Sequence, residues 1–253
     1  MIRIAAVGDI HLGPDLAGKH RLGLADVPER ADVLLLAGDL TRHGTVEEAR
    51  VVANEYQDVG VPVVAVLGNH DYQSDQEDDV TRVLRDAGLT VLEGDGVVLD
   101  LPSGRLGVAG AKGFCLGFAG RCASEFGEPE MKAFTRHGRE SAEHLAEGLA
   151  KIENADVKVA LTHFSPVDDT LVGEPPEIWA FLGNYLLGEA IDEAGVHLAV
   201  HGHAHAGCEK GVTAGGTRVR NVAQPVIRCA YAIYEVHPSH AESAATSGAA
   251  AAG

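Results

Sequence analysis

Histidines, carboxylates and one carboxamide recur in this chain directly after apolar segments. IRIAAV is followed by GDIH, VLLLA by GDL, and VPVVAVL by GNHD. Further along, a histidine follows the apolar segment VKVALT, and more occur in VHGHAH. The candidate site residues in these groups are Asp9, His11, Asp39, Asn69, His70, His163, His201 and His203. Their side chains are metal ligands or proton carriers, and none of them helps to fill an apolar core.

Each group has an ordinary structural interpretation when it is taken alone. A carboxylate or a histidine after a strand is common as a turn residue or a cap, and a single histidine is often a hydrogen-bonded core residue. Together, five imidazoles, two carboxylates and a carboxamide at one edge would be costly to desolvate unless they bind something. The set therefore favours bound metal ions.

The ligand types indicate which metals are expected and how many. Nitrogen and oxygen donors without a thiolate disfavour a structural zinc site and suit Mn, Fe, Zn or Co. So many ligands are too many for one catalytic ion with an open position, but they suit two ions that share a carboxylate. Two ions roughly 3.5–4 Å apart are a common device for phosphoryl transfer to water.

The apolar segments that precede these groups have the length of β-strands. They are continuously apolar and often β-branched, which indicates strands covered on both faces. The expected strands are 2–7, 33–37, 61–67, 97–101, 106–109, 157–161 and 197–200. A helix lies between the second and third of them, with Thr45 and Glu48 as a capping box and Gly60 as its stop. Because this is a βαβ unit, the polar ends of the first three strands should meet at one sheet edge.

Further helices and a second group of strands follow. Apolar periodicity predicts helices at about 75–87, 139–153 and 184–194. The segments HLAVHGHAH, TRVRNVA and CAYAIYEV predict strands and turns of a second sheet. We expect one domain over residues 1–237, and we expect the small and polar residues 238–253 to be disordered.

The composition is that of an ordinary soluble protein, with 45% apolar and 23% charged residues. No run of about 18 apolar residues occurs and the N-terminus lacks a signal-peptide pattern, so a cytoplasmic location is the default expectation. Four scattered cysteines without a C-x-x-C pair fit reduced thiols. The formal charge of −17 argues against a nucleic-acid partner. It still permits a small anionic substrate, because bound metal ions can dominate the local field.

The ordered series GDIH, GDL, GNHD, H and GHAH, from residue 8 to residue 203, resembles the calcineurin-like metallophosphoesterase superfamily. The resemblance implies an α/β/β/α sandwich of four layers, in which helices flank two mixed β-sheets. The ligands it implies are Asp9, His11 and His203 for one ion, Asn69, His163 and His201 for the other, and Asp39 as the bridge. By the same resemblance, His70 is not a ligand.

The resemblance also implies a reaction. A hydroxide that bridges the two ions would attack phosphorus in line, while the ions neutralise the phosphoryl oxygens. His70 would donate a hydrogen bond or a proton to the leaving oxygen, and Asp39 would hold the ions together. Asp71 fits two interpretations: it orients the His70 imidazole, or it begins a turn.

Departures from related patterns narrow the class of enzyme. The protein serine/threonine phosphatases resemble G-D-x-x-D-R-G and G-N-H-E, whereas this chain has GDLTRHG and GNHD, which disfavours that activity. The DIHLG opening faintly resembles the DNA-repair nucleases of the superfamily, but the acidic charge argues against them. The chain then resembles the broad group of the superfamily that includes cyclic-nucleotide phosphodiesterase-like members. We expect phosphodiesters rather than phosphomonoesters as its substrates. The alternatives are a phosphomonoesterase on a small metabolite, or a non-catalytic binding or scaffold module, which the complete ligand series and His70 disfavour.

Two long connections are candidates for substrate contacts. Residues 110–134 contain four phenylalanines, five glycines, Lys112 and Arg121, and the segment after His163 contains the only tryptophan, Trp179. Residues 110–134 fit equally well as a small cluster packed on the sandwich, and the segment after His163 is a second candidate rim of the site. Arg42 is expected either to reach a phosphate oxygen or to be solvated, and His205 is expected to support a ligand or to be exposed. No prediction is attached to the oligomeric state.

Overall fold

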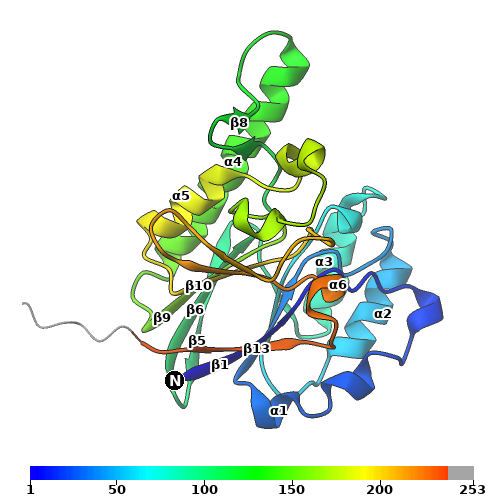
Figure 1. Cartoon of the computed structure of the whole chain (residues 1–253). Coiled ribbons are helices and arrows are strands. Elements are labelled where there is room, and N and C mark those ends of the chain that lie inside the picture. Colours follow the sequence, from blue (N-terminus) through cyan, green and yellow to red (C-terminus); the bar gives the residue numbers. More distant parts are fainter. Residues whose placement is uncertain (239–253) are drawn as a thin grey trace, which may run out of the picture.

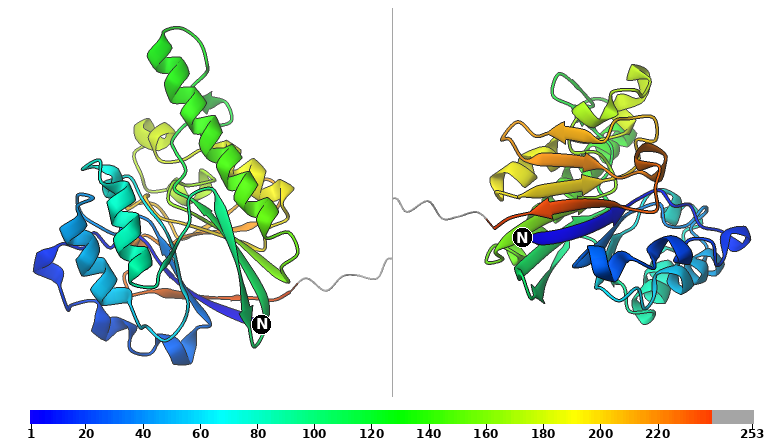
Figure 2. Two further views of the ribbon diagram at one scale, coloured as in Figure 1. Left: turned by 180° about the vertical axis from the view of Figure 1, so that it is seen from behind. Right: turned by 60° about the horizontal axis from the view of Figure 1, so that its bottom comes forward.

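The structure is a computed structural model that describes residues 1–238 of the 253-residue chain. Apart from Pro238, the tail predicted over residues 238–253 falls outside the described residues. Two large β-sheets pack face to face and carry helices on their outer sides (Figures 1 and 2). The predicted α/β/β/α sandwich of four layers is confirmed.

The first sheet has five strands in the order β13-β1-β2-β3-β4. Their bounds are β1 Ile2–Val7, β2 Val33–Ala37, β3 Val63–Val66, β4 Thr90–Val91 and β13 Ala232–Val236. Strands β1 to β4 are parallel, and β13 is antiparallel to β1. The sequence analysis was wrong about β13, which it expected in the second sheet. The residues of β13 suit a strand in either sheet, and only the pairing of Ile2 with Val236 places it in the first.

The second sheet has six strands in the order β11-β12-β10-β9-β6-β5. Their bounds are β5 Asp95–Leu101, β6 Gly104–Ala111, β9 Val157–Thr162, β10 Leu198–His201, β11 Lys210–Val212 and β12 Arg218–Asn221. The four inner strands are parallel, and the two edge strands are antiparallel to their neighbours. A separate small hairpin joins β7, Gly117–Phe118, to β8, Arg121–Cys122.

The helices are α1 Val27–Arg30, α2 Val46–Tyr56, α3 Glu77–Asp86, α4 Pro129–Lys151, α5 Tyr185–Glu193 and α6 Gln224–Ile227. Short 3₁₀ turns cover Pro14–Leu16, Arg21–Leu24, His70–Tyr72, Asp169–Leu171 and Pro176–Phe181. The predicted capping box of α2 is present, because Thr45 and Glu48 each accept the other's backbone N–H at 3.3 Å. Helix α4 begins at Pro129 rather than near residue 139, and its first turns project beyond the sandwich (Figure 1). No helix within residues 1–238 is long and apolar enough to cross a membrane.

Alternation along β1 explains why the strands are apolar on both faces. Ala5 and Val7 pack in the layer beneath α2 and α3, whereas Ile2 and Ile4 pack against the second sheet. The outer face of the second sheet is covered by α4 and α5, with Leu145 in its core. Because the strands are enclosed on both sides, polar side chains can gather only where the strands end.

Candidate metal centre

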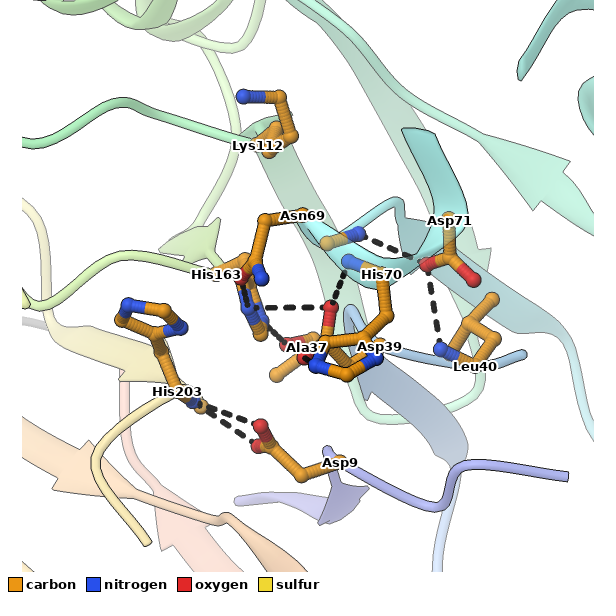
Figure 3. Close-up of polar contacts among 12 residues, drawn as sticks. Asp9, Ala37, Asp39, Leu40, Asn69, His70, Asp71, Lys112, His163 and His203 are labelled. Atoms are coloured by element: carbon orange, nitrogen blue, oxygen red, sulfur yellow. Dashed lines mark hydrogen bonds and ion pairs between the residues drawn. The ribbon is translucent and has the colours of Figure 1, made fainter. Parts of the chain in front are cut away.

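The polar ends of five strands meet at one edge of the sandwich (Figure 3). In the first sheet, Asp9 and His11 follow β1, Asp39 follows β2, and Asn69 follows β3; in the second, His163 follows β9 and His203 follows β10. The first three strands are parallel and adjacent, so their carboxyl ends lie side by side, as the sequence predicts. The second sheet brings its histidines to the same edge.

Asp39 lies at the middle of this arrangement and is almost fully buried, with 1% exposure. Its Oδ1 accepts the backbone N–H of His70 at 2.8 Å and lies 3.3 Å from His163 Nε2. Its Oδ2 lies 3.8 Å from His11 Nε2 and 3.9 Å from His70 Nε2. Burial opposes ionisation, but His163 and the hydrogen bonds outweigh it and hold the pKa of Asp39 well below its usual range. The carboxylate therefore faces imidazoles on two sides.

Asp9 joins the first sheet to the segment after β10. The backbone N–H of His203 donates to its two carboxylate oxygens at 3.0 and 2.9 Å. His205 Nε2 lies 2.8 Å from Asp9 Oδ1, and this hydrogen bond raises the pKa of His205. One candidate ligand group thus consists of Asp9, His11, Asp39 and His205, whose donor atoms lie within 4.8 Å of one another.

His163, His203 and Asp39 form the second candidate ligand group, again with donor atoms within 4.8 Å of one another. The fully buried His163 donates from Nδ1 to the Ala37 carbonyl at 2.9 Å, which turns its Nε2 toward Asn69 Oδ1, also 2.9 Å away. Burial lowers the pKa of His163, but Asp39 outweighs it and raises the pKa to about 9. Burial lowers the pKa of His203 to about 3, so its ring is neutral and able to bind a metal.

Several residues of these turns have left-handed backbone conformations, which are common at functional sites. Asp9, His11, Asp39 and His203 have left-handed φ angles of 56°, 43°, 50° and 70°. Such conformations cost roughly 1–3 kcal/mol each in a residue with a side chain, and they persist only where surrounding contacts enforce them. At Gly38, φ is 80° and a Cβ would lie 2.6 Å from His163 Nδ1, so only glycine fits.

The donor set fits metal ions. His11 Nε2 is buried and has no hydrogen-bond partner within residues 1–238, although it faces a carboxylate. Burial lowers the pKa of His11, which favours the neutral ring that binds metals. Imidazole nitrogens, carboxylates and one carboxamide oxygen suit Mn, Fe, Zn or Co, whichever is bound.

Comparison of the sequence with known families decides what kind of protein carries this site. The profile described as calcineurin-like phosphoesterase matches residues 2–207. The chain belongs to this family. It is therefore a metal-dependent phosphoesterase of a family that uses a dinuclear metal centre, and the two groups of His and Asp side chains that share Asp39 could hold metal ions. A search of curated proteins finds no significant sequence match.

Several solved structures share the calcineurin-like fold at low sequence identity. Phosphopantetheinyl hydrolase of Mycobacterium tuberculosis is 17% identical, with 89% of this chain and 90% of that chain covered and a TM-score of 0.61. A Thermus thermophilus protein is 16% identical over 87% of this chain and 88% of that one, with a TM-score of 0.59. A putative 5′-nucleotidase of Staphylococcus aureus has 16% identity and a TM-score of 0.54, and the match covers 87% of this chain but 48% of that one.

His201 does not lie where the sequence analysis expected it, whereas His205 is exposed, as one of the two expectations had it, and lies in a candidate ligand group. His201 is the last residue of β10 and fully buried, and its Nε2 lies 2.8 Å from Thr170 Oγ1. It belongs to neither ligand group. The chain turns after β10 at Gly202, so His203 and His205 are the histidines brought to the site. The signal was in the sequence, because the histidines of the tetrapeptide GHAH are His203 and His205.

Asp71 does not orient the His70 imidazole, which was one of its two expected roles. His70 Nδ1 donates to the Arg42 carbonyl at 2.8 Å, so a backbone group and not Asp71 orients the imidazole. Asp71 is fully buried and accepts four hydrogen bonds. They come from the Leu40 N–H at 3.1 Å, the Gly68 N–H at 2.8 Å, and the N–H and hydroxyl of Thr41 at 2.8 and 2.5 Å. Asp71 therefore ties together the two turns that carry Asp39 and Asn69.

The remaining candidates lie outside the two ligand groups. The guanidinium of Arg42 forms an ion pair with Asp15 at 3.0 Å, so its backbone carbonyl is the group that serves the site. Arg121 lies over the ring of Trp179 at 5.8 Å, outside the ligand groups. Phe118 belongs to a small satellite cluster of the core. Lys112, by contrast, lines a pocket beside Asn69.

Proposed function

We propose that this phosphoesterase hydrolyses small phosphoesters at a two-metal centre and prefers phosphodiesters. The proposed ligands are Asp9, His11 and His205 for one ion, Asn69, His163 and His203 for the other, and Asp39 between them. Compared with the ligands expected from the sequence, His205 replaces His201, and His203 moves to the second ion.

The observation that carries this proposal is the sharing of Asp39 by two ligand groups. Its Oδ1 faces His163 Nε2 at 3.3 Å, and its Oδ2 faces His11 Nε2 at 3.8 Å. One oxygen is thus directed to each group, as a bridging carboxylate requires. Two ions bound there would supply Lewis-acid activation of water and neutralise charge on the phosphoryl oxygens.

His70 is proposed to protonate the leaving oxygen. Its Nδ1 is engaged with the Arg42 carbonyl, so Nε2 is the nitrogen that faces the site, 3.9 Å from Asp39 Oδ2. Because the Nδ1 proton is held by that carbonyl, Nε2 has a proton to give only when the ring is an imidazolium.

The preference for diesters rests on charge. The chain has a formal charge of −17, so its field disfavours the approach of anions. A phosphodiester carries one negative charge, whereas a monoester carries about 1.5–2 at neutral pH. The electrostatic penalty is therefore smaller for the diester.

Two chromogenic substrates test the reaction and its preference. Purified protein supplied with Mn²⁺ should release nitrophenol from bis-p-nitrophenyl phosphate with a higher kcat/KM than from p-nitrophenyl phosphate. A higher value for the monoester would reverse the preference. An absence of turnover of either ester with any divalent metal, together with well under two ions per chain, would leave the scaffold alternative.

Variants test the ligand and acid roles separately. His205→Ala should lower the bound metal per chain, measured by elemental analysis, whereas the proposal expects His201→Ala to keep its metal if the protein folds. The opposite pattern would restore the original assignment. His70→Ala should retain its metals and lose turnover by about 100-fold or more, as expected for removal of a general acid. Loss of metal in that variant would make His70 a ligand instead.

A further inference from the structure

A pocket of about 430 Å³ lies next to the proposed metal ligand Asn69. Its wall includes the rings of Tyr72, Phe114 and Phe164. The Phe164 ring also contacts the proposed ligand His203, with ring centroids 4.4 Å apart. A substrate whose phosphate is held at the metal centre can therefore extend the rest of its structure into this pocket.

The pocket contains a buried cation that the proposed reaction does not use. Lys112 is 9% exposed, and its Nζ donates to the Gly113 carbonyl at 3.0 Å. An ammonium has three donors, and no other hydrogen bond or ion pair of this Nζ occurs within residues 1–238. Two of its three donors are thus available to a ligand.

The surroundings of Lys112 offset only part of the cost of burying its charge. Its Nζ lies 4.9 Å from the ring centroid of Tyr72 and 5.4 Å from those of Phe114 and Phe164. These cation–π contacts are favourable, but they leave the free N–H groups unpaired. Glu93 lines the same pocket and its charge favours the ammonium, but its Oε2 accepts the backbone N–H of Lys112 at 2.9 Å. An incoming anion would supply the acceptor that the remaining N–H groups of this ammonium lack.

The backbone ties Lys112 firmly to the metal centre. The Lys112 carbonyl accepts the N–H groups of His163 at 3.0 Å and Phe164 at 3.2 Å. In Figure 3, Lys112 lies beyond Asn69, on the side away from Asp9. The main chain of Lys112 is therefore fixed relative to the proposed ligands, and its Nζ is restrained by the Gly113 carbonyl, as a specificity site requires.

We propose that this pocket selects phosphoesters that carry a second anionic group, a carboxylate or a further phosphate, on the part of the molecule beyond the scissile phosphate. Lys112 pairs with that group while the aromatic wall packs against the atoms that connect it to the phosphate. The inference rests on the proposed function and narrows its substrate class. It also explains how such a substrate is accepted by an acidic protein, because the positive charge is placed locally.

Phosphonates that cannot be hydrolysed test this inference without turnover. Binding of phenylphosphonate, its 3- and 4-carboxy derivatives and benzene-1,4-diphosphonate is measured by calorimetry on Mn²⁺-loaded protein. At least one analogue with a second anionic group should bind wild type about 10- to 100-fold more tightly than phenylphosphonate, as expected for a charge-assisted pair. The carboxylated and diphosphonate compounds distinguish the two sources of the second charge. If no analogue binds more tightly than phenylphosphonate, the inference is overturned.

Lys112→Met keeps the aliphatic stem and removes the charge. It should abolish the advantage of the analogue with a second anionic group and leave phenylphosphonate affinity within about threefold, whereas Lys112→Arg should keep part of the advantage. Lys132→Met, at an exposed position on α4, is the matched control and should behave as wild type. Equal weakening of every analogue in Lys112→Met would show a merely structural role. If the variants fail to fold, the wild-type series decides by itself.

Turnover of bis-p-nitrophenyl phosphate by the same preparations separates the two proposals. Protein that hydrolyses this ester and does not discriminate among the phosphonates refutes the role of Lys112 alone. Protein that does neither refutes the proposed function.

Discussion

Replacing Asp71 by Asn tests whether one buried carboxylate holds the metal-binding turns in place. Its two oxygens each accept two hydrogen bonds, from donors in the turn after β2 and the turn after β3. Asn has the same shape, but it keeps only one of the two oxygens. Its amide group must therefore face two donors that previously had an acceptor.

The expected cost follows from those two donors. A buried donor left without a partner costs about 1–3 kcal/mol, so the two together should cost about 2–6 kcal/mol. In a protein of this size, 1 kcal/mol shifts Tm by about 2–4 °C. The variant should therefore melt about 4–24 °C below wild type. It should also hold less metal, because the displaced turns carry Asp39 and Asn69.

Thermal unfolding followed by circular dichroism, with and without EDTA, measures this effect. The EDTA arm separates the loss of hydrogen bonds from the loss of metal. Asp86→Asn makes the same chemical change at an exposed position of α3 and should change stability by less than about 0.5 kcal/mol. If Asp71→Asn melts within 2 °C of wild type in EDTA and keeps its metals, the reasoning about this carboxylate is refuted.

Three further substitutions probe particular contacts. The Tyr56 hydroxyl is buried and has no hydrogen-bond partner within residues 1–238. Tyr56→Phe should therefore keep the free energy of unfolding, measured by urea titration, or raise it by up to about 1 kcal/mol. A clear fall would reveal a missed partner. A Cβ at residue 202 would overlap Asp9 Oδ2. Gly202→Ala should therefore displace that carboxylate and lower the metal content found by elemental analysis. Full metal content would contradict this expectation. Thr170→Val removes the hydroxyl that lies 2.8 Å from His201 Nε2. It should lower the free energy of unfolding, measured by thermal unfolding, by about 1–3 kcal/mol and leave the metal content unchanged. Metal loss would return His201 to the ligand set.

Local pattern was enough to predict the strands and the edge at which they end. Continuous apolar runs of strand length indicated strands buried on both faces, and β1, β2 and β9 match the expected segments closely. The helix between β2 and β3 made these strands parallel, and parallel strands bring their carboxyl ends together. Asp9, Asp39 and Asn69 could therefore be placed near one another from the sequence alone.

The sequence pattern was less informative about the sheet to which β13 belongs and the residue at which α4 begins. The residues of β13 suit a strand in either sheet, and pairing with β1 decided between them. The start of α4 lies in a glycine-containing and polar stretch, whose apolar periodicity is too weak to show that the helix begins at Pro129. In each case the deciding contact joins residues far apart in the chain or lies outside the periodic segment.

The sequence by itself determined the chemistry of this protein: which ligand types it has, in which order, and at the ends of which strands. The tertiary structure decided which individual side chains face the centre. His201 was expected there but remains inside β10, whereas the left-handed turn at His203 brings His203 and His205 to the edge. Asp71 and Lys112 acquire their roles from partners in other turns and strands. A side chain's direction after a strand depends on backbone angles that contacts from the facing sheet enforce, and a linear pattern does not contain those contacts.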